Sequence, residues 1–96
     1  MNGIWKLNGQ FYGWLTDNGS LFSRNGDRIG TLAIANNAFY NHGGAYMGEL
    51  LNGNRIGINP DHSDWMGPMS NPDGQIYNEP LENLMATEVI GYHSPA

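Results

Sequence analysis

The chain has 96 residues, 40% of them hydrophobic and 14% charged, which is the composition of one small globular domain and excludes a disordered tail. It contains four basic and nine acidic residues, which gives a net charge of −5. We therefore expect neither nucleic acid nor an anionic membrane surface as a partner. Cysteine is absent, which excludes disulfides and thiolate metal sites, and no apolar run reaches the roughly 18 residues of a transmembrane helix.

The first recognisable element spans residues 4–15. It begins with an apolar and an aromatic residue, Ile4 and Trp5, continues to Asn8-Gly9, and reaches a second glycine at Gly13. Asn-Gly between apolar runs is typical of a two-residue β-turn, because both residues tolerate positive φ. Residues 4–15 are therefore predicted to form a β-hairpin.

The same pattern recurs along the chain. Residues 21–32 and 39–50 repeat it closely, and looser copies run over 58–69 and 76–92, the last with an insertion at 80–86. The second glycine falls at positions 13, 30, 48, 67 and 91. Because segments of like spacing fold alike, we predict one domain, residues 1–96, made of tandem hairpin units. The predicted units lie at about residues 3–19, 20–37, 38–54, 55–73 and 74–96.

The repeated positions also indicate which side chains are buried. The residue that opens each copy is never polar and marks the core: it is Ile4, Leu21, Phe39, Ile58 and Ile76 in turn. The next residue is usually aromatic, which indicates a half-exposed face or one that covers a second layer. The positions one before and two after the second glycine both stay mostly apolar. This favours a β-bulge at that glycine, with close backbone approach as the alternative.

These observations predict an all-β fold, an antiparallel meander of tandem β-hairpins arranged radially. Such short strands must hide their edges by closure, in a propeller-like or barrel-like ring. We expect the N-terminal strand to close the ring by pairing with residues 89–92. The five glycine positions leave two arrangements open, four petals with a closing strand or five petals.

The pattern apolar-aromatic-x-x-Asn-Gly-x-x-apolar-Gly-Trp, as in residues 4–14, resembles the repeat of the bacterial 4-fold beta flower proteins. The resemblance covers residues 3–50 well, 55–69 loosely and the rest poorly. It implies a small radial all-β domain from a bacterium, and it supplies no activity, cofactor or functional residue. A weaker likeness links residues 13–19 to choline-type cell-wall-binding repeats, whose period is longer and richer in Trp and Tyr.

Two groups of residues are candidates for binding. Neighbouring hairpin tips would bring His42 near Asp61 and His62, where a His–Asp pair could orient an imidazole or join a metal site. The alternative is a solvated rim, because this spacing fits no metal motif. The second group is aromatic and could stack on sugar rings, cover a self-association surface or form the core. Its candidate binding members are Trp5, Trp14, Tyr40, Trp65 and Tyr77.

The sequence contains no nucleophile elbow, phosphate loop, paired-acid motif or zinc helix, so we expect no enzyme activity, no catalytic residue, no metal and no cofactor. The oxygen-rich loops at 59–64 and 71–74 do not follow the EF-hand ligand order. We expect a non-catalytic β-repeat module that acts through a protein partner or self-association. Carbohydrate binding through exposed aromatic residues is the alternative. The N-terminus lacks the features of a signal peptide, so the expected location is the cytoplasm.

Overall fold

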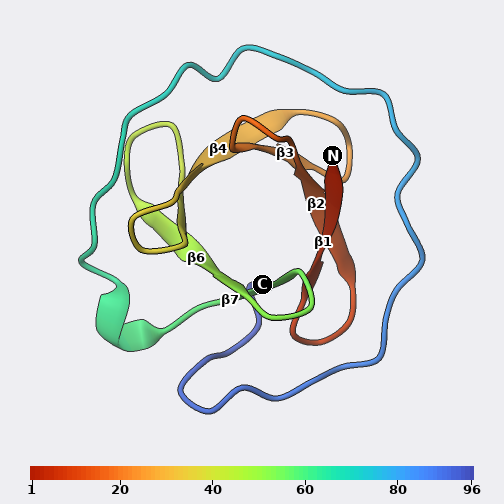
Figure 1. Cartoon of the computed structure of the whole chain (residues 1–96), viewed down its shortest axis with the longest axis vertical. Coiled ribbons are helices and arrows are strands. Elements are labelled where there is room, and N and C mark those ends of the chain that lie inside the picture. The colour runs from red at the N-terminus through yellow and green to blue at the C-terminus, as the bar shows by residue number, and fades with distance from the viewer.

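The structure, a computed structural model, describes all 96 residues. Seven short strands follow one another around a closed barrel, which confirms the predicted all-β, radial arrangement of hairpins (Figure 1). The strands are β1 (Asn2–Lys6), β2 (Phe11–Leu15), β3 (Ser20–Ser23), β4 (Arg28–Ala33), β5 (Ala38–Tyr40), β6 (Tyr46–Leu51) and β7 (Arg55–Gly57). The only helix, the 3-10 turn η1 (Pro60–His62), has three residues, so no helix here could cross a membrane.

The barrel consists of three antiparallel hairpins, β1–β2, β3–β4 and β5–β6, and the single strand β7 that closes the ring. Strand β7 pairs with β1 in parallel, with Trp5 opposite Arg55 and Lys6 opposite Ile56. A meander of seven strands requires this, because its first and last strands run in the same direction. The predicted closure by residues 89–92 is therefore wrong. The ring has three petals and a closing strand, rather than four petals and a closing strand or five petals.

Each hairpin contains a β-bulge immediately before its second glycine. In the first hairpin Ile4 pairs with Gly13 while Trp5 pairs with Phe11, so Tyr12 is the extra residue. The same register shift leaves Ile29 and Met47 as extra residues in the other two hairpins. The bulge turns the positions before and after the glycine toward one side of the strand. The bulge predicted from the apolar pattern is confirmed in these three hairpins and does not form at Gly67 or Gly91, which lie outside the strands.

Close backbone approach at the same glycines is also present. A Cβ added to Gly13 would lie 2.0 Å from the carbonyl oxygen of Phe22, on the next hairpin. At Gly30 the corresponding distance, to the carbonyl oxygen of Tyr40, is 2.5 Å. Neighbouring hairpins thus approach closely where only glycine fits. Both interpretations therefore hold in the three hairpins that form, whereas Gly91 lies in no strand and has open space around it.

The barrel interior repeats with the hairpins. Its fully buried members include Ile4, Leu21, Phe39 and Ile56, one from each leading strand, and the side chains at positions 12, 29 and 47 and at 15, 32 and 50 pack around them. Ile56 takes the core position predicted for Ile58, because the fourth leading strand begins two residues earlier than the pattern suggested. Ile58 is only half-buried. Ile76 lies outside the barrel and packs on an outer aromatic cluster.

Residues 63–96 form an extended belt that circles the barrel from the end of η1 back to β7 (Figure 1). Of the hairpin predicted for unit 55–73 only the leading strand, β7, forms, and neither strand predicted for unit 74–96 forms. All five prolines lie between positions 60 and 95, where each removes a backbone donor that a strand ladder would need. The belt forms only isolated bridges to the barrel, at Ala45–Met66, Asp27–Gln75 and Ile58–His93.

The belt is bound at the tips of all three hairpins through the same backbone contact. The amide of Gly67 donates to the carbonyl of Gly44 at 3.0 Å, that of Ile76 to Gly26 at 2.9 Å, and that of Leu84 to Gly9 at 2.8 Å. The three acceptors are the turn glycines of the repeat, which lie 17 and 18 residues apart in the sequence. The repeated hairpins therefore supply three equivalent docking sites for one extended segment.

Two separate constraints, the backbone conformation of the turn and the close approach of the belt, require glycine at the hairpin tip. Gly26 has φ of +93°, a conformation that side chains with a Cβ rarely adopt. A Cβ at this position would also lie 2.1 Å from the carbonyl oxygen of Ile76 on the belt. Turn geometry and belt docking thus impose the same residue.

The double requirement predicts different costs for two glycine-to-alanine substitutions. Gly53→Ala should cost about 1–2 kcal/mol of stability, because Gly53 has φ of +77° but open space around it. Gly26→Ala should cost at least about 1 kcal/mol more, because the belt must move and lose the Ile76 hydrogen bond. Urea unfolding of both variants measures the difference. Equal losses would show that the belt does not press on the turn.

Candidate functional site

The belt covers most of the aromatic residues that the sequence proposed for binding. Trp14 and Tyr40 are buried, at 9% and 1% exposure. Trp5 is half-buried, and its indole Nε1 donates to the carbonyl of Glu82 on the belt at 2.8 Å. The ring of Tyr40 lies against Gly67, where a Cβ would come within 2.3 Å of it. The aromatic face therefore covers a second layer, which was one of the two interpretations left open.

Four aromatic residues of the first two hairpins, Trp5, Phe11, Trp14 and Phe22, form a separate cluster outside the barrel. Phe11 contacts Trp5 and Trp14 edge to face, with ring centroids 5.5 and 5.3 Å apart. Phe22 completes the buried cluster, and Ile76 of the belt packs on it. This second small core attaches the belt to the barrel.

The other two aromatic candidates lie apart from this cluster. Tyr77 is 88% exposed on the belt, and its hydroxyl donates to Gln75. Trp65 stacks on the imidazole of His62 with a centroid distance of 3.8 Å and an interplanar angle of 11°. The five aromatic candidates therefore do not share one open surface.

His42 is not paired with Asp61 or His62 by any hydrogen bond or ion pair. Its Nε2 contacts the backbone carbonyl oxygen of Arg28 at 2.9 Å, and its Nδ1 contacts the Ser70 hydroxyl at 3.1 Å. His42 thus links the second and third hairpins to the belt. Asp61 lies exposed in η1, and His62 turns to a different carboxylate. No group of three His, Asp or Glu side chains is arranged to hold a metal ion.

Equivalent outer positions of the three hairpins carry three different chemistries. In the first hairpin they hold the edge-to-face pair Phe11–Trp14. In the second, the Arg28 guanidinium donates to the Thr31 hydroxyl at 3.4 Å. In the third, the Tyr46 hydroxyl donates to the Glu49 carboxylate at 3.3 Å. Equivalent backbone positions thus carry an aromatic pair, a cationic side chain with a hydroxyl, and a phenol with a carboxylate.

The Glu49 carboxylate joins η1 and the C-terminal end of the belt to β6. Its side chain is buried, and one oxygen contacts the His62 imidazole while the other accepts from the hydroxyl of Tyr92. The Tyr46 hydroxyl, which donates to the same carboxylate, accepts from the backbone amide of Asn59 at 2.9 Å. The carboxylate oxygens are therefore all engaged, which makes this cluster a structural clasp for η1 and the C-terminal end of the belt.

The tyrosines of the clasp are held in their protonated form. Burial raises the pKa of Tyr46 to about 12. The hydrogen bond to Glu49 raises the pKa of Tyr92, with burial acting in the same direction. Both phenols thus stay neutral donors to the carboxylate at physiological pH.

Most of the exposed apolar surface lies on the belt. Nine large apolar side chains are exposed, and seven of them belong to the belt: Met66, Met69, Tyr77, Leu81, Leu84, Met85 and Ile90. Exposed apolar groups gathered on one element indicate contact with another molecule, and methionine is common on adaptable binding surfaces. The belt is therefore the candidate interaction element.

The acidic arm, residues 79–94, concentrates these features. Met85 and Ile90 are 87% and 100% exposed, and Leu81 and Leu84 are also exposed. The three carboxylates of the arm, Glu79, Glu82 and Glu88, are exposed and form no ion pair. A groove of about 480 Å³ lies between residues 86–94 and the first hairpin tip at Leu7 and Asn8.

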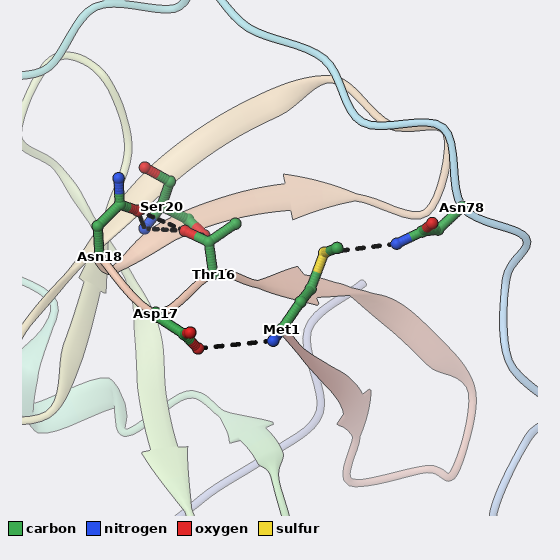
Figure 2. A network of polar contacts seen from close by, with 6 residues as sticks. All are labelled: Met1, Thr16, Asp17, Asn18, Ser20 and Asn78. Carbon is green, nitrogen blue, oxygen red and sulfur yellow. Dashed lines mark hydrogen bonds and ion pairs between the residues drawn. The ribbon is translucent and has the colours of Figure 1, made fainter.

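The arm is anchored along its length. Just before it, Asn78 contacts the thioether of Met1, whose amino group is 3.5 Å from the carboxylate of Asp17 (Figure 2). Within the arm, the amide of Thr87 donates to the carbonyl of Leu7 at 2.8 Å. At its end, the Ser94 hydroxyl accepts from the amide of Asn8 at 3.1 Å. The groove is thus framed by fixed backbone.

Neither the clasp nor the arm is predicted from the sequence, although each leaves a signal there. Glu49 is the only acid at a repeat position held by Trp14 and Thr31 in the other copies. No Lys or Arg follows Arg55, and all the prolines follow it, which separates the belt compositionally from the barrel.

No family model, curated protein or solved structure matches this chain. The resemblance to the 4-fold beta flower proteins stays a prediction, and the function is inferred from the geometry of this molecule.

The clasp predicts a specific loss of stability on removal of one hydroxyl. Tyr92→Phe should cost about 1.5–3 kcal/mol, because a buried carboxylate loses a donor. Tyr77→Phe removes an exposed hydroxyl that donates to Gln75 and should cost little. Urea unfolding compares the two variants. A cost for Tyr92→Phe no greater than that for Tyr77→Phe would contradict the clasp.

The raised pKa of Tyr46 predicts alkaline sensitivity. A tyrosine whose pKa is higher in the folded than in the unfolded state contributes stability in full below its ordinary pKa of 10.0, and this contribution is lost as pH rises toward about 12. Titration by phenolate absorbance should show a late component in the wild type that is smaller by one tyrosine in Tyr46→Phe, because the pKa values of Tyr12 and Tyr92 are also raised. An undiminished late component in the variant would contradict the raised pKa of Tyr46.

Proposed function

We propose that this chain is a non-catalytic protein-interaction module and that its acidic arm binds a basic, apolar segment of a partner protein. The observation that carries the proposal is the combination of four exposed apolar side chains, three unpaired carboxylates and a groove within residues 79–94. Apolar anchors set among charges are the usual composition of a protein-binding site.

The charge distribution of the belt favours a positively charged partner. The belt carries five acidic residues and no Lys or Arg, whereas residues 1–62 hold four of each sign. Two arms facing each other would repel, so contact between the arms of two copies is disfavoured. A segment with Lys or Arg beside Leu or Phe satisfies both the carboxylates and the groove, whose volume accommodates one or two large side chains.

The geometry favours a protein partner over a glycan. Sugar rings stack on open aromatic faces, and of the aromatic candidates Trp14 and Tyr40 are buried. Tyr77 is the one largely exposed ring, and it contacts no second ring.

The proposal predicts selective binding of a basic apolar peptide. A fluorescent peptide of alternating Lys and Leu should bind the wild type, and a Glu–Leu peptide of equal length should not. Because the contact is partly ionic and the carboxylates are exposed, binding should weaken as salt is added. The double variant Met85→Ser/Ile90→Ser should lose roughly tenfold in affinity, the equivalent of ~1.4 kcal/mol. Fluorescence anisotropy measures these affinities.

Two matched controls separate the arm from general acidity. Met66→Ser/Met69→Ser changes exposed apolar residues elsewhere on the belt and should leave the affinity unchanged. Glu82→Gln/Glu88→Gln should weaken binding more than Asp64→Asn/Asp73→Asn, although both remove two charges. Equal effects of the matched pairs, or no binding of the Lys–Leu peptide, would refute the arm as the site.

A further inference from the structure

The inner face of the belt has no partner other than the barrel. Its amides at positions 67, 76, 84 and 87 all donate to barrel carbonyls, at distances of 2.8–3.0 Å. Within the belt, the only backbone hydrogen bond joins Tyr92 to Val89 in a local turn. The belt therefore has no core of its own, and its placement depends wholly on the surface that it encircles.

The groups that bind the belt all belong to the barrel. They do not depend on whether the belt is connected to that same barrel. The acceptors at Gly9, Gly26 and Gly44 belong to hairpins folded by local pairing. The surfaces beneath the belt, such as the ring of Tyr40, also belong to the barrel. A barrel from a second copy presents the same acceptors at the same spacing.

The connection between barrel and belt is short and exposed. The last anchored residue before it is His62, which contacts Glu49, and the first belt amide bound to a hairpin is that of Gly67. Directly after His62, Ser63 and Asp64 are exposed, and Trp65 then contacts His62 again through a backbone hydrogen bond of 2.9 Å and a stacked ring. A change of backbone direction at Ser63 and Asp64 would transfer these Trp65 contacts, with the rest of the belt, to a second barrel while leaving η1 in place.

From this arrangement we propose that the belt docks in trans, so that two copies of this chain exchange belts and form a dimer. Each belt then makes with the partner barrel the contacts that it makes here with its own, and only the hinge at Ser63 and Asp64 changes. Exchange of an identical element adds few new costs beyond association, so the dimer is favoured at high protein concentration. The occupant is a second copy because the site requires glycine over Tyr40 and donors spaced as at 67, 76 and 84.

The inference concerns the inner face of the belt, whereas the proposed function uses the outer face of the acidic arm. An exchanged dimer presents two arms, and a monomer presents one. Peptide binding and belt exchange are therefore measured separately, and either can fail without the other.

Engineered cysteines test the exchange directly, because the chain has none of its own. Ala45 and Met66 pair across the belt–barrel contact. The double variant Ala45→Cys/Met66→Cys should form an internal disulfide, which establishes that the geometry permits the bond. An equal mixture of the two single variants, unfolded together in urea, refolded at high concentration and oxidised, should form disulfide-linked dimers containing one of each chain.

The control mixture pairs Ala45→Cys with Ile34→Cys, which is exposed and lies on no belt contact. It should give no crosslinked dimer above background, and dilution before refolding should abolish the crosslink in the test mixture. Deletion of Ser63 and Asp64 shortens the hinge by up to about 7 Å and should shift the chain from monomer to dimer in light scattering. Equal crosslinking in the two mixtures, or none in the test mixture, would overturn the exchange.

Discussion

Three backbone carbonyls, those of Gly9, Gly26 and Gly44, determine where the last third of the chain lies. Each accepts a hydrogen bond from the belt at a point where the turn has no side chain to keep the belt away. The residue that permits the positive φ of the turn is thus also the residue that permits docking. Because the hairpins repeat, their docking sites repeat, and an otherwise structureless segment is fixed at regular intervals around the barrel.

Local signals made the hairpins predictable from the sequence. Asn8-Gly9 and Asn25-Gly26 indicate turns, and the apolar positions around Gly13 indicate a bulge, all within a dozen residues of chain. The two-residue turn type expected from Asn-Gly is wrong, because only the glycine of each pair has positive φ, and in the first hairpin the loop-closing hydrogen bond joins Lys6 to Gln10 across three residues. The belt follows no such rule, because its partners lie far away in the sequence and its backbone has no period. Gly67 matched the repeat for a different reason, since it is the ring of Tyr40 that leaves no room for a Cβ there.

Some of the aromatic residues predicted to bind a ligand lie beneath the belt and are not open to one. Trp5 and Tyr40 look available when the barrel is considered alone, and the belt then covers them. Glu49 could not be recognised as a clasp, because its partner Tyr92 lies 43 residues away. The exposed apolar residues of the arm match no sequence motif, so the sequence does not distinguish them from ordinary core residues. The structure does, because it places them at the surface of a segment that is bound to the barrel.

Identical docking sites raise the question of what prevents the belt from shifting by one hairpin. Such a shift would place Ile76 where Gly67 lies, and its Cβ would come within about 2.3 Å of the Tyr40 ring. It would also take Ile76 away from the aromatic cluster of the first two hairpins and Tyr92 away from Glu49, which would leave a buried carboxylate short of a donor. The shared backbone contacts therefore hold the belt, while the differences between the hairpins in side-chain chemistry fix its register.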